Sequence, residues 1–255
     1  MHQHSKLFLG LRRLICMQGP LPLLQRLALV PSMQEGQVRL VVVLSQLGDF
    51  DSLEYATALA RVIPRLKDAG IQLLAIAIGD ASGADRFCDF TGFPRQSLQV
   101  DTEPYLHREL GLYQGLQISA GPWPALLLMC AGVGSSGTLA EVLRGYTGDH
   151  TAPALIEDEE LVDFTPFPSI SGSFFSRLGH GYLRPFELAT IRLRNMVEVL
   201  TNWRTYVPCD DFLCQRGGTF LLDKDGCLLY EHRDRGILGF SETMGQPLAF
   251  LDPYL

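Results

Sequence analysis

The chain has 255 residues and a formal net charge of −7, and 47% of its residues are hydrophobic. This length is sufficient for one large domain with its own hydrophobic core. The excess of acidic residues argues against a nucleic-acid-binding protein. No uninterrupted apolar run of about 18 residues occurs, so we predict no membrane-spanning helix.

The N-terminal segment, residues 1–35, is apolar with Arg12, Arg13 and Arg26 placed between the hydrophobic residues. It lacks the separate apolar region and small-residue exit of a cleavable leader. We expect an N-terminal helical extension that packs on the domain. The alternative is a basic amphipathic segment that contacts a membrane surface or a partner protein. The predicted location is cytoplasmic, with membrane-peripheral contact left open.

Strands and helices alternate in the first half of the chain. The runs 38–45, 70–80 and 97–102 have the continuous apolar character of buried strands. Helical spacing of apolar residues follows each run. The helices are predicted from Asp51 to about Leu66, over 82–92 and over 103–112. Short connections between them indicate a parallel α/β core.

Three local features refine these helices. Asp51 and Glu54 resemble a capping box at the start of the first helix. Pro64 is expected to kink that helix or to end it early. Ser82 is expected to open the second helix and Gly92 to close it.

The middle of the chain is less regular. An apolar run covers 122–132, and a helix is predicted over 135–149 with Ser135 or Ser136 as its cap. The preceding "GVGSSGT" lacks the Gly-Lys-Ser/Thr ending of a phosphate-binding loop. We interpret 150–183 as a long ordered loop or small subdomain, and 186–203 as a helix.

In the predicted helix over 186–203, one apolar face combines Leu188, Ile191, Met196, Leu200 and Trp203. The C-terminal run 218–234 then has two apolar strands that flank an Asp-Gly turn, which predicts a β-hairpin.

Several strings occur in an order that is similar to the peroxiredoxin-like branch of the AhpC/TSA family. They are "GDFDSLEYATAL", "IAIGDASGADRFCDFTGFP", "VDTEPYLHRELGL" and "GGTFLLDKDGCLLYEHRD". A further string, "LLLMCAGVGSSGTLAEVLRGYTGD", resembles the longer versions found in phototrophs. The resemblance implies a family of redox and antioxidant proteins, and it makes a photosynthetic organism the expected source.

The resemblance implies a thioredoxin-like α/β fold, in which helices flank a central mixed sheet. We expect the thioredoxin-like domain at 36–235. A long helical and loop insertion is expected at about 114–205, before the C-terminal hairpin. A C-terminal tail then covers 236–255.

The active-site turn departs from the family. The family turn commonly carries Gly-Cys-x-x-Cys, where a helix N-terminus stabilises a nucleophilic thiolate. This chain has Gly48, Asp49, Phe50, Asp51 and Ser52 there. A carboxylate has no oxidation ladder with which to reduce a peroxide, and a serine hydroxyl is too basic. We therefore predict a non-catalytic interaction or assembly factor, with the turn serving in helix capping, as a cation site or as a general base.

The alternative function is a thiol-disulfide oxidoreductase or antioxidant protein that uses a relocated dithiol, Cys209 and Cys214. The resemblance implies that the loop entering the hairpin lies against the turn, which places Cys214 near Asp49 and Ser52. Two acids stand between the cysteines, and their charge is expected to raise the thiol pKa values. A third option is a small-molecule-binding domain that uses the pocket around the turn.

The six cysteines are few for the length, so we expect a reducing compartment in which most of them are small buried groups. Cys227 would add a third sulfur to Cys209 and Cys214, but no fourth metal ligand is evident. We predict no cofactor, no metal and a protein partner.

Overall fold

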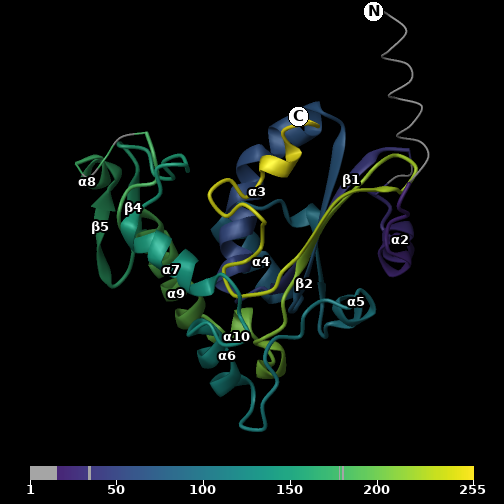
Figure 1. Cartoon of the computed structure of the whole chain (residues 1–255), viewed down its shortest axis with the longest axis horizontal. Coiled ribbons are helices and arrows are strands. Elements are labelled where there is room, and N and C mark those ends of the chain that lie inside the picture. Colours follow the sequence, from purple (N-terminus) through teal and green to yellow (C-terminus); the bar gives the residue numbers. More distant parts are fainter. Residues whose placement is uncertain (1–15, 34–35, 178, 180) are drawn as a thin grey trace, which may run out of the picture.

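The computed structural model describes residues 16–33, 36–177, 179 and 181–255 (Figure 1). Of the predicted N-terminal extension, residues 1–15 and 34–35 therefore lie outside the described residues. The described part of this extension contains one helix, α2 (Leu21–Ala28), which begins after Pro20.

The central sheet has five strands in the order β3-β2-β1-β6-β7. They are β1 (Val38–Gln46), β2 (Ile71–Ile78), β3 (Leu98–Asp101), β6 (Gly218–Leu222) and β7 (Leu228–Arg233). The first three strands run parallel, whereas β6 pairs antiparallel with both β1 and β7. This mixed sheet with flanking helices confirms the predicted α/β, thioredoxin-like fold class.

The remaining elements surround the sheet or lie in the insertion. The helices that follow the parallel strands are α3 (Phe50–Asp68), α4 (Ala81–Thr91) and α5 (Tyr105–Glu109). The insertion contains α6 (Pro122–Cys130), α7 (Thr138–Thr147), β4 (Leu161–Phe164), β5 (Phe167–Ser171), α8 (Gly172–Ser176), α9 (Glu187–Thr201) and α10 (Trp203–Tyr206). Short 3-10 turns occur at Arg95–Ser97, Asp210–Phe212 and Ala249–Leu251.

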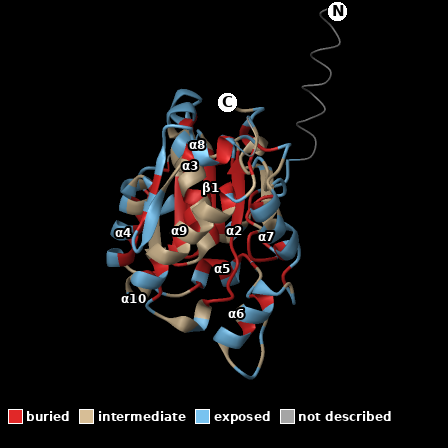
Figure 2. Cartoon of the chain, turned by 90° about the vertical axis from the view of Figure 1, so that its left-hand side faces the viewer, coloured by how far each residue is buried: buried red, intermediate tan, exposed pale blue. Residues whose placement is uncertain are grey.

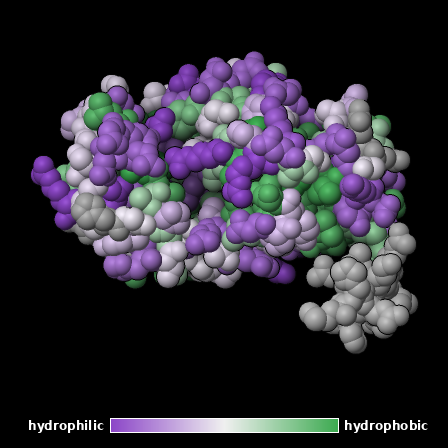
Figure 3. Space-filling model, turned by 90° about the horizontal axis from the view of Figure 1, so that it is seen from above, coloured by the Kyte–Doolittle hydropathy of each residue, from purple (hydrophilic) through white to green (hydrophobic). Residues whose placement is uncertain are grey.

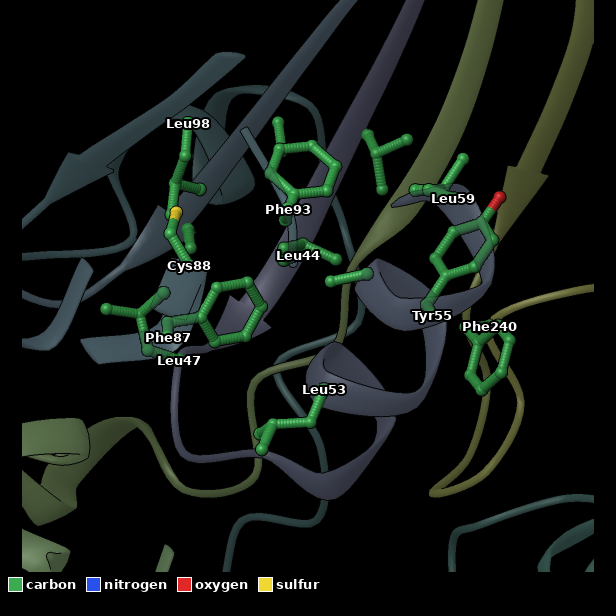
Figure 4. Close-up of a cluster of buried hydrophobic side chains, with 14 of the residues drawn as sticks. Leu44, Leu47, Leu53, Tyr55, Leu59, Phe87, Cys88, Phe93, Leu98 and Phe240 are labelled. Atoms are coloured by element: carbon green, nitrogen blue, oxygen red, sulfur yellow. The ribbon is translucent and has the colours of Figure 1, made fainter. Parts of the chain in front are cut away.

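Strand β1 shows how the two faces of the sheet are built. Leu40, Val42 and Leu44 face α3, α4 and the C-terminal tail, while Val41 and Val43 face α2 and α5. Successive side chains of a strand point to opposite faces, so a continuous apolar strand is the pattern expected of a sheet covered on both sides. Figure 4 shows part of the first cluster, including Leu44, Tyr55 and Phe240.

The surface of the molecule combines polar side chains with exposed hydrophobic ones, such as Leu29 and Leu127. Figure 2 shows the buried central strands behind helices whose outer surfaces are exposed. Figure 3 shows hydrophilic side chains over much of the face seen from above, with hydrophobic ones in smaller groups.

The insertion has a small core of its own. Ile156, Val162, Phe164 and Phe175 form a buried cluster against α9. The described residues of 150–183 thus include a two-stranded sheet, β4–β5, and a small buried core, which agrees with the small-subdomain interpretation of this stretch. Directly after this stretch in the chain, Arg184 and Glu187 form a buried ion pair at 3.0 Å.

Some local predictions need correction. The cap of α3 is Asp49 rather than Asp51: its Oδ1 accepts the Asp51 N–H at 3.1 Å, while Glu54 pairs with Arg192 instead. Pro64 does not end α3, since the helix continues to Asp68. Asp80, rather than Ser82, caps α4, whereas Gly92 closes this helix as predicted.

Two helices of the insertion also differ from expectation. Helix α7 begins after Gly137 without a side-chain cap, because glycine, rather than Ser135 or Ser136, occupies the cap position. Ser135 Oγ instead accepts the N–H of Ile237 at 2.7 Å. In α9, Leu188 is buried but Leu200 is 55% exposed, so the predicted apolar face is covered over only part of its length.

The cysteines are not all reduced. Cys16 and Cys227 form a disulfide that ties the chain before α2 to the β6–β7 turn. The sequence gives no sign of this pairing because the two residues are 211 positions apart. This pair is therefore an exception to the expectation that most cysteines are small buried groups, and Cys227 is not free to bind a metal.

Candidate functional site

The segment 48–52 lies at the carboxyl end of the central strand β1 and contains the end of the β1–α3 turn and the first residues of α3. Gly48 is required there by close packing, since a Cβ atom would approach Val207 Cγ2 to 2.4 Å. Asp49 caps α3, where the unpaired N–H groups of the first turn favour a negative charge. Asp51 and Ser52 follow and are buried. The helix-capping reading of this turn thus has a structural basis.

Arg216 fills the space that faces the turn and is 1% exposed. Its guanidinium forms ion pairs with Asp49 and, at 3.3 Å, with Asp51. Two further donors bond to the backbone, because Nε donates to Cys214 O and Nη2 to Leu213 O, both at 3.1 Å. A planar guanidinium fork suits this arrangement, which a lysine ammonium would not reproduce.

The loop before β6 brings Arg216 to this position. Gly217 lies so close to β1 that a Cβ atom would approach Val43 O to 2.1 Å. Its N–H donates to Asp234 Oδ2 at 3.0 Å, and its carbonyl accepts the Asp234 N–H at 3.1 Å. Asp234, at the end of β7, thus fixes the loop that carries Arg216.

The C-terminal tail also contacts this site. The N–H of Leu238 donates to Asp51 Oδ2 at 2.6 Å. We call Asp49, Asp51, Arg216 and Asp234 the carboxylate–arginine cluster. It joins the start of α3 to the loop before β6, the end of β7 and the tail.

The cluster contains three carboxyl groups and one guanidinium. Burial raises the pKa of Asp51 well above its ordinary value, and the charge of Asp49 adds to this, while Arg216 and the Leu238 N–H oppose it. Burial likewise raises the pKa of Asp234 to about 7. Both carboxyls therefore hold protons more readily than exposed ones. Proton uptake is how a buried cluster with excess acid limits its charge.

The interior of the cluster is not fully hydrogen bonded. Asp51 Oδ1, Ser52 Oγ and Asp234 Oδ1 have no hydrogen-bond partner. All three residues line a small cavity of about 10 Å³ beside Thr219. This volume is at the lower limit for a single water molecule. Among the described residues, no group of three or more His, Cys, Asp or Glu side chains is placed to hold a metal ion.

The structure leaves Cys209 and Cys214 as free thiols. Cys214 is buried and directs its Sγ to Pro122 O at 3.6 Å, while the Cys209 carbonyl accepts Gln46 Nε2 at 3.1 Å. Both residues are thus anchored close to the turn. Burial raises the pKa of the Cys214 thiol. The dithiol remains a prediction, and the structure does not join the two sulfurs.

The charges around Cys214 are not those predicted. Arg216 lowers the pKa of this thiol and Asp49 raises it. Asp210 acts elsewhere, since it accepts hydrogen bonds from Trp123 at 3.0 Å and from Arg204 at 2.8 Å. The charges that act on the Cys214 thiol are therefore those of Arg216 and Asp49, and burial is the largest cause of its raised pKa.

Sequence reasoning missed Arg216, Asp234 and Cys130. The string "QRGGTF" offered a signal, because a charged residue directly before a buried strand must find a partner. Cys130 is an exposed free thiol at the end of α6. Although the residue is exposed, partial desolvation of its sulfur by the surrounding chain raises the pKa, the charge of Asp49 adds to this, and Arg216 lowers it.

Comparison with known proteins identifies the family. Residues 58–236 match the family model described as AhpC/TSA antioxidant enzyme. The chain therefore belongs to the AhpC/TSA family. The match begins within α3, so the turn at 48–52 precedes the matched residues. No curated protein matches the chain. In the part of the chain that the structure describes, no helix has the length and apolar character to cross a bilayer.

Proposed function

We propose that this AhpC/TSA family member is a non-catalytic interaction or assembly factor. The observation that carries the proposal is the carboxylate–arginine cluster. At the position where a redox turn presents a thiolate to a helix N-terminus, this chain has Asp49, whose carboxylate pairs with the buried Arg216. An ion pair of this kind holds elements together and has no route to accept electrons.

The cysteines nearest the cluster are poorly suited to replace that thiolate. The pKa values of Cys130 and Cys214 are both raised, and burial is the largest cause in each case. A reactive cysteine depends on the opposite shift, because the thiolate is the nucleophile. This contrast favours the interaction role over thiol-disulfide exchange by Cys209 and Cys214.

The insertion supports a role in binding another protein. It adds helices and a small sheet outside the central fold, and it carries much of the exposed apolar surface of the described residues. Contiguous exposed apolar surface of this kind commonly marks a site of protein–protein contact.

A steady-state peroxidase assay tests the proposal. The full chain is supplied with hydrogen peroxide or an organic hydroperoxide and with a dithiol reductant, and peroxide loss is followed against a buffer control. We expect no loss above that control, and the same result for Cys214→Ser. Catalytic turnover by the wild-type chain that Cys214→Ser abolishes would establish the oxidoreductase function instead.

A further inference from the structure

The insertion exposes a broad apolar face. On α7, Leu139, Val142, Leu143 and Tyr146 follow the i, i+3, i+4, i+7 spacing of one helix face. In a packed protein such a stripe faces a core, yet here Leu139 is 58% and Leu143 60% exposed. Figure 2 shows α6 and α7 with mostly exposed surfaces.

Neighbouring residues extend this face. Gly132 after α6 lies against Leu139, because a Cβ atom built on it would be 3.2 Å from Leu139 Cδ1. At the other end of α7, the ring of Tyr146 meets that of Phe186 at 6.1 Å. We define the α6–α7 face as the exposed side chains of Leu127, Leu128, Val133, Leu139, Val142, Leu143, Tyr146 and Phe186.

We call the exposed side chains of Leu139 and Leu143 the ridge of this face. A cleft opens beside the ridge, between α7 and α9. Its volume is about 410 Å³. Gly145 and Ala189 line it with little side-chain bulk, and Met196 and Leu238 add apolar walls. The ridge and the cleft therefore lie next to each other on one surface, as a projecting and a receiving element.

The charges of this region are already paired. Residues 113–148 contain only two charged side chains, Glu141 and Arg144, which bond to each other at 2.8 Å. Arg192, the charged residue lining the cleft, bonds to Glu54 at 2.8 Å and to Glu141 at 3.3 Å. A charged ligand or an anionic membrane would find no unpaired cation here, whereas surface-binding helices are usually rich in lysine and arginine.

The size of the face matches one side of a protein interface. With roughly 150–210 Å² for each fully exposed side chain of these types, the α6–α7 face exposes on the order of 700 Å². A standard interface buries about 800 Å² per partner, and monomers seldom expose so large an apolar patch.

We propose that a second copy of this chain covers the α6–α7 face. In a two-fold arrangement the same patch serves both partners, so it must contain both a projection and its recess. The ridge of Leu139 and Leu143 from one copy fills the cleft beside Gly145 and Ala189 of the other. This inference rests on the proposed interaction function and names its first partner.

Sedimentation velocity on the full chain, from about 0.5 to 50 μM, tests the assignment. We expect a concentration-dependent dimer whose dissociation constant rises at least tenfold in Leu143→Glu, as is typical for a buried anchor. Leu161→Glu is the matched control, because Leu161 is a leucine of similar exposure, 62%, located on β4 outside the face. We expect it to dimerise like the wild type.

Alkylation of Cys130 provides a second readout. This exposed thiol lines the cleft, so the dimer should slow its reaction with N-ethylmaleimide. We expect faster labelling in Leu143→Glu but not in Leu161→Glu, at equal circular dichroism for all three chains. The inference is overturned by a monomer at 50 μM, by a dimer that Leu143→Glu leaves intact, or by a monomer that floats with phosphatidylcholine vesicles. None of these outcomes depends on whether the chain consumes peroxide.

Discussion

Replacement of Arg216 by methionine should destabilise the protein strongly. Arg216 is 1% exposed, and it is the guanidinium that pairs with Asp49 and Asp51. Methionine fills a similar volume but leaves these buried carboxylates without a countercharge. Removing one partner of a buried ion pair typically costs about 3–5 kcal/mol, and for a chain of this size that corresponds to a fall in Tm of about 10 °C.

The loss of folding stability in Arg216→Met should depend on pH. Arg216 lowers the pKa values of Asp51 and Asp234, so both carboxyls will hold protons to a higher pH in Arg216→Met. Protonated carboxyls need no countercharge, and the destabilisation should therefore be smaller at pH 5 than at pH 8. Urea unfolding at the two pH values measures the difference directly.

Two further variants separate charge from general packing. Arg204→Met removes an arginine that also pairs with an aspartate, Asp210, but whose side chain is 67% exposed. An exposed pair contributes about 0–1 kcal/mol, so this control should unfold nearly like the wild type. Arg216→Lys keeps the charge without the fork and should lie between the two. An Arg216→Met chain no less stable than Arg204→Met, or equally destabilised at both pH values, would refute the reasoning.

Three other changes have defined outcomes. The pKa of Asp234 is about 7 when folded, so this group makes the wild type lose stability as the pH rises from about 4 to about 7. Asp234→Asn should flatten that slope in urea unfolding curves, and an unchanged slope would contradict the raised pKa. Cys227→Ser removes the disulfide with Cys16 and should lower stability by about 2–4 kcal/mol. A reducing agent should then lower the Tm of the wild type but not of this variant, as scanning calorimetry would show. Glu187→Ala removes the buried carboxylate partner of Arg184 and leaves Asp158, at 3.1 Å, as its remaining ion-pair partner. The change should cost about 3 kcal/mol, whereas a loss below about 1 kcal/mol would show that Asp158 and water replace the missing carboxylate.

The sheet could be predicted from the sequence because its signals are local. The run 38–45 is continuously apolar, and the observed strand, Val38–Gln46, differs from it by one residue. Asp225 and Gly226 marked the hairpin turn, since glycine accepts the positive φ, 81°, that this position requires. Such features depend on a few neighbouring residues.

The site could be predicted only in part, because its members come from distant segments. The departure at Asp49 and Asp51 was visible in the sequence, but Arg216 lies 165 residues beyond Asp51. Only the folded chain shows that this arginine closes the turn. The same limit applies to the Cys16–Cys227 disulfide and to the exposed stripe on α7, because helical periodicity predicts an apolar face but not what covers it.

We infer that this member of the AhpC/TSA family has exchanged a redox turn for an ion-paired one. The most direct test counts free thiols by mass spectrometry after alkylation, before and after a brief exposure to equimolar hydrogen peroxide. Four thiols are free in the structure, at Cys88, Cys130, Cys209 and Cys214. We predict that all four are recovered after the exposure. Rapid loss of two of them, with a new disulfide between Cys209 and Cys214, would contradict the account.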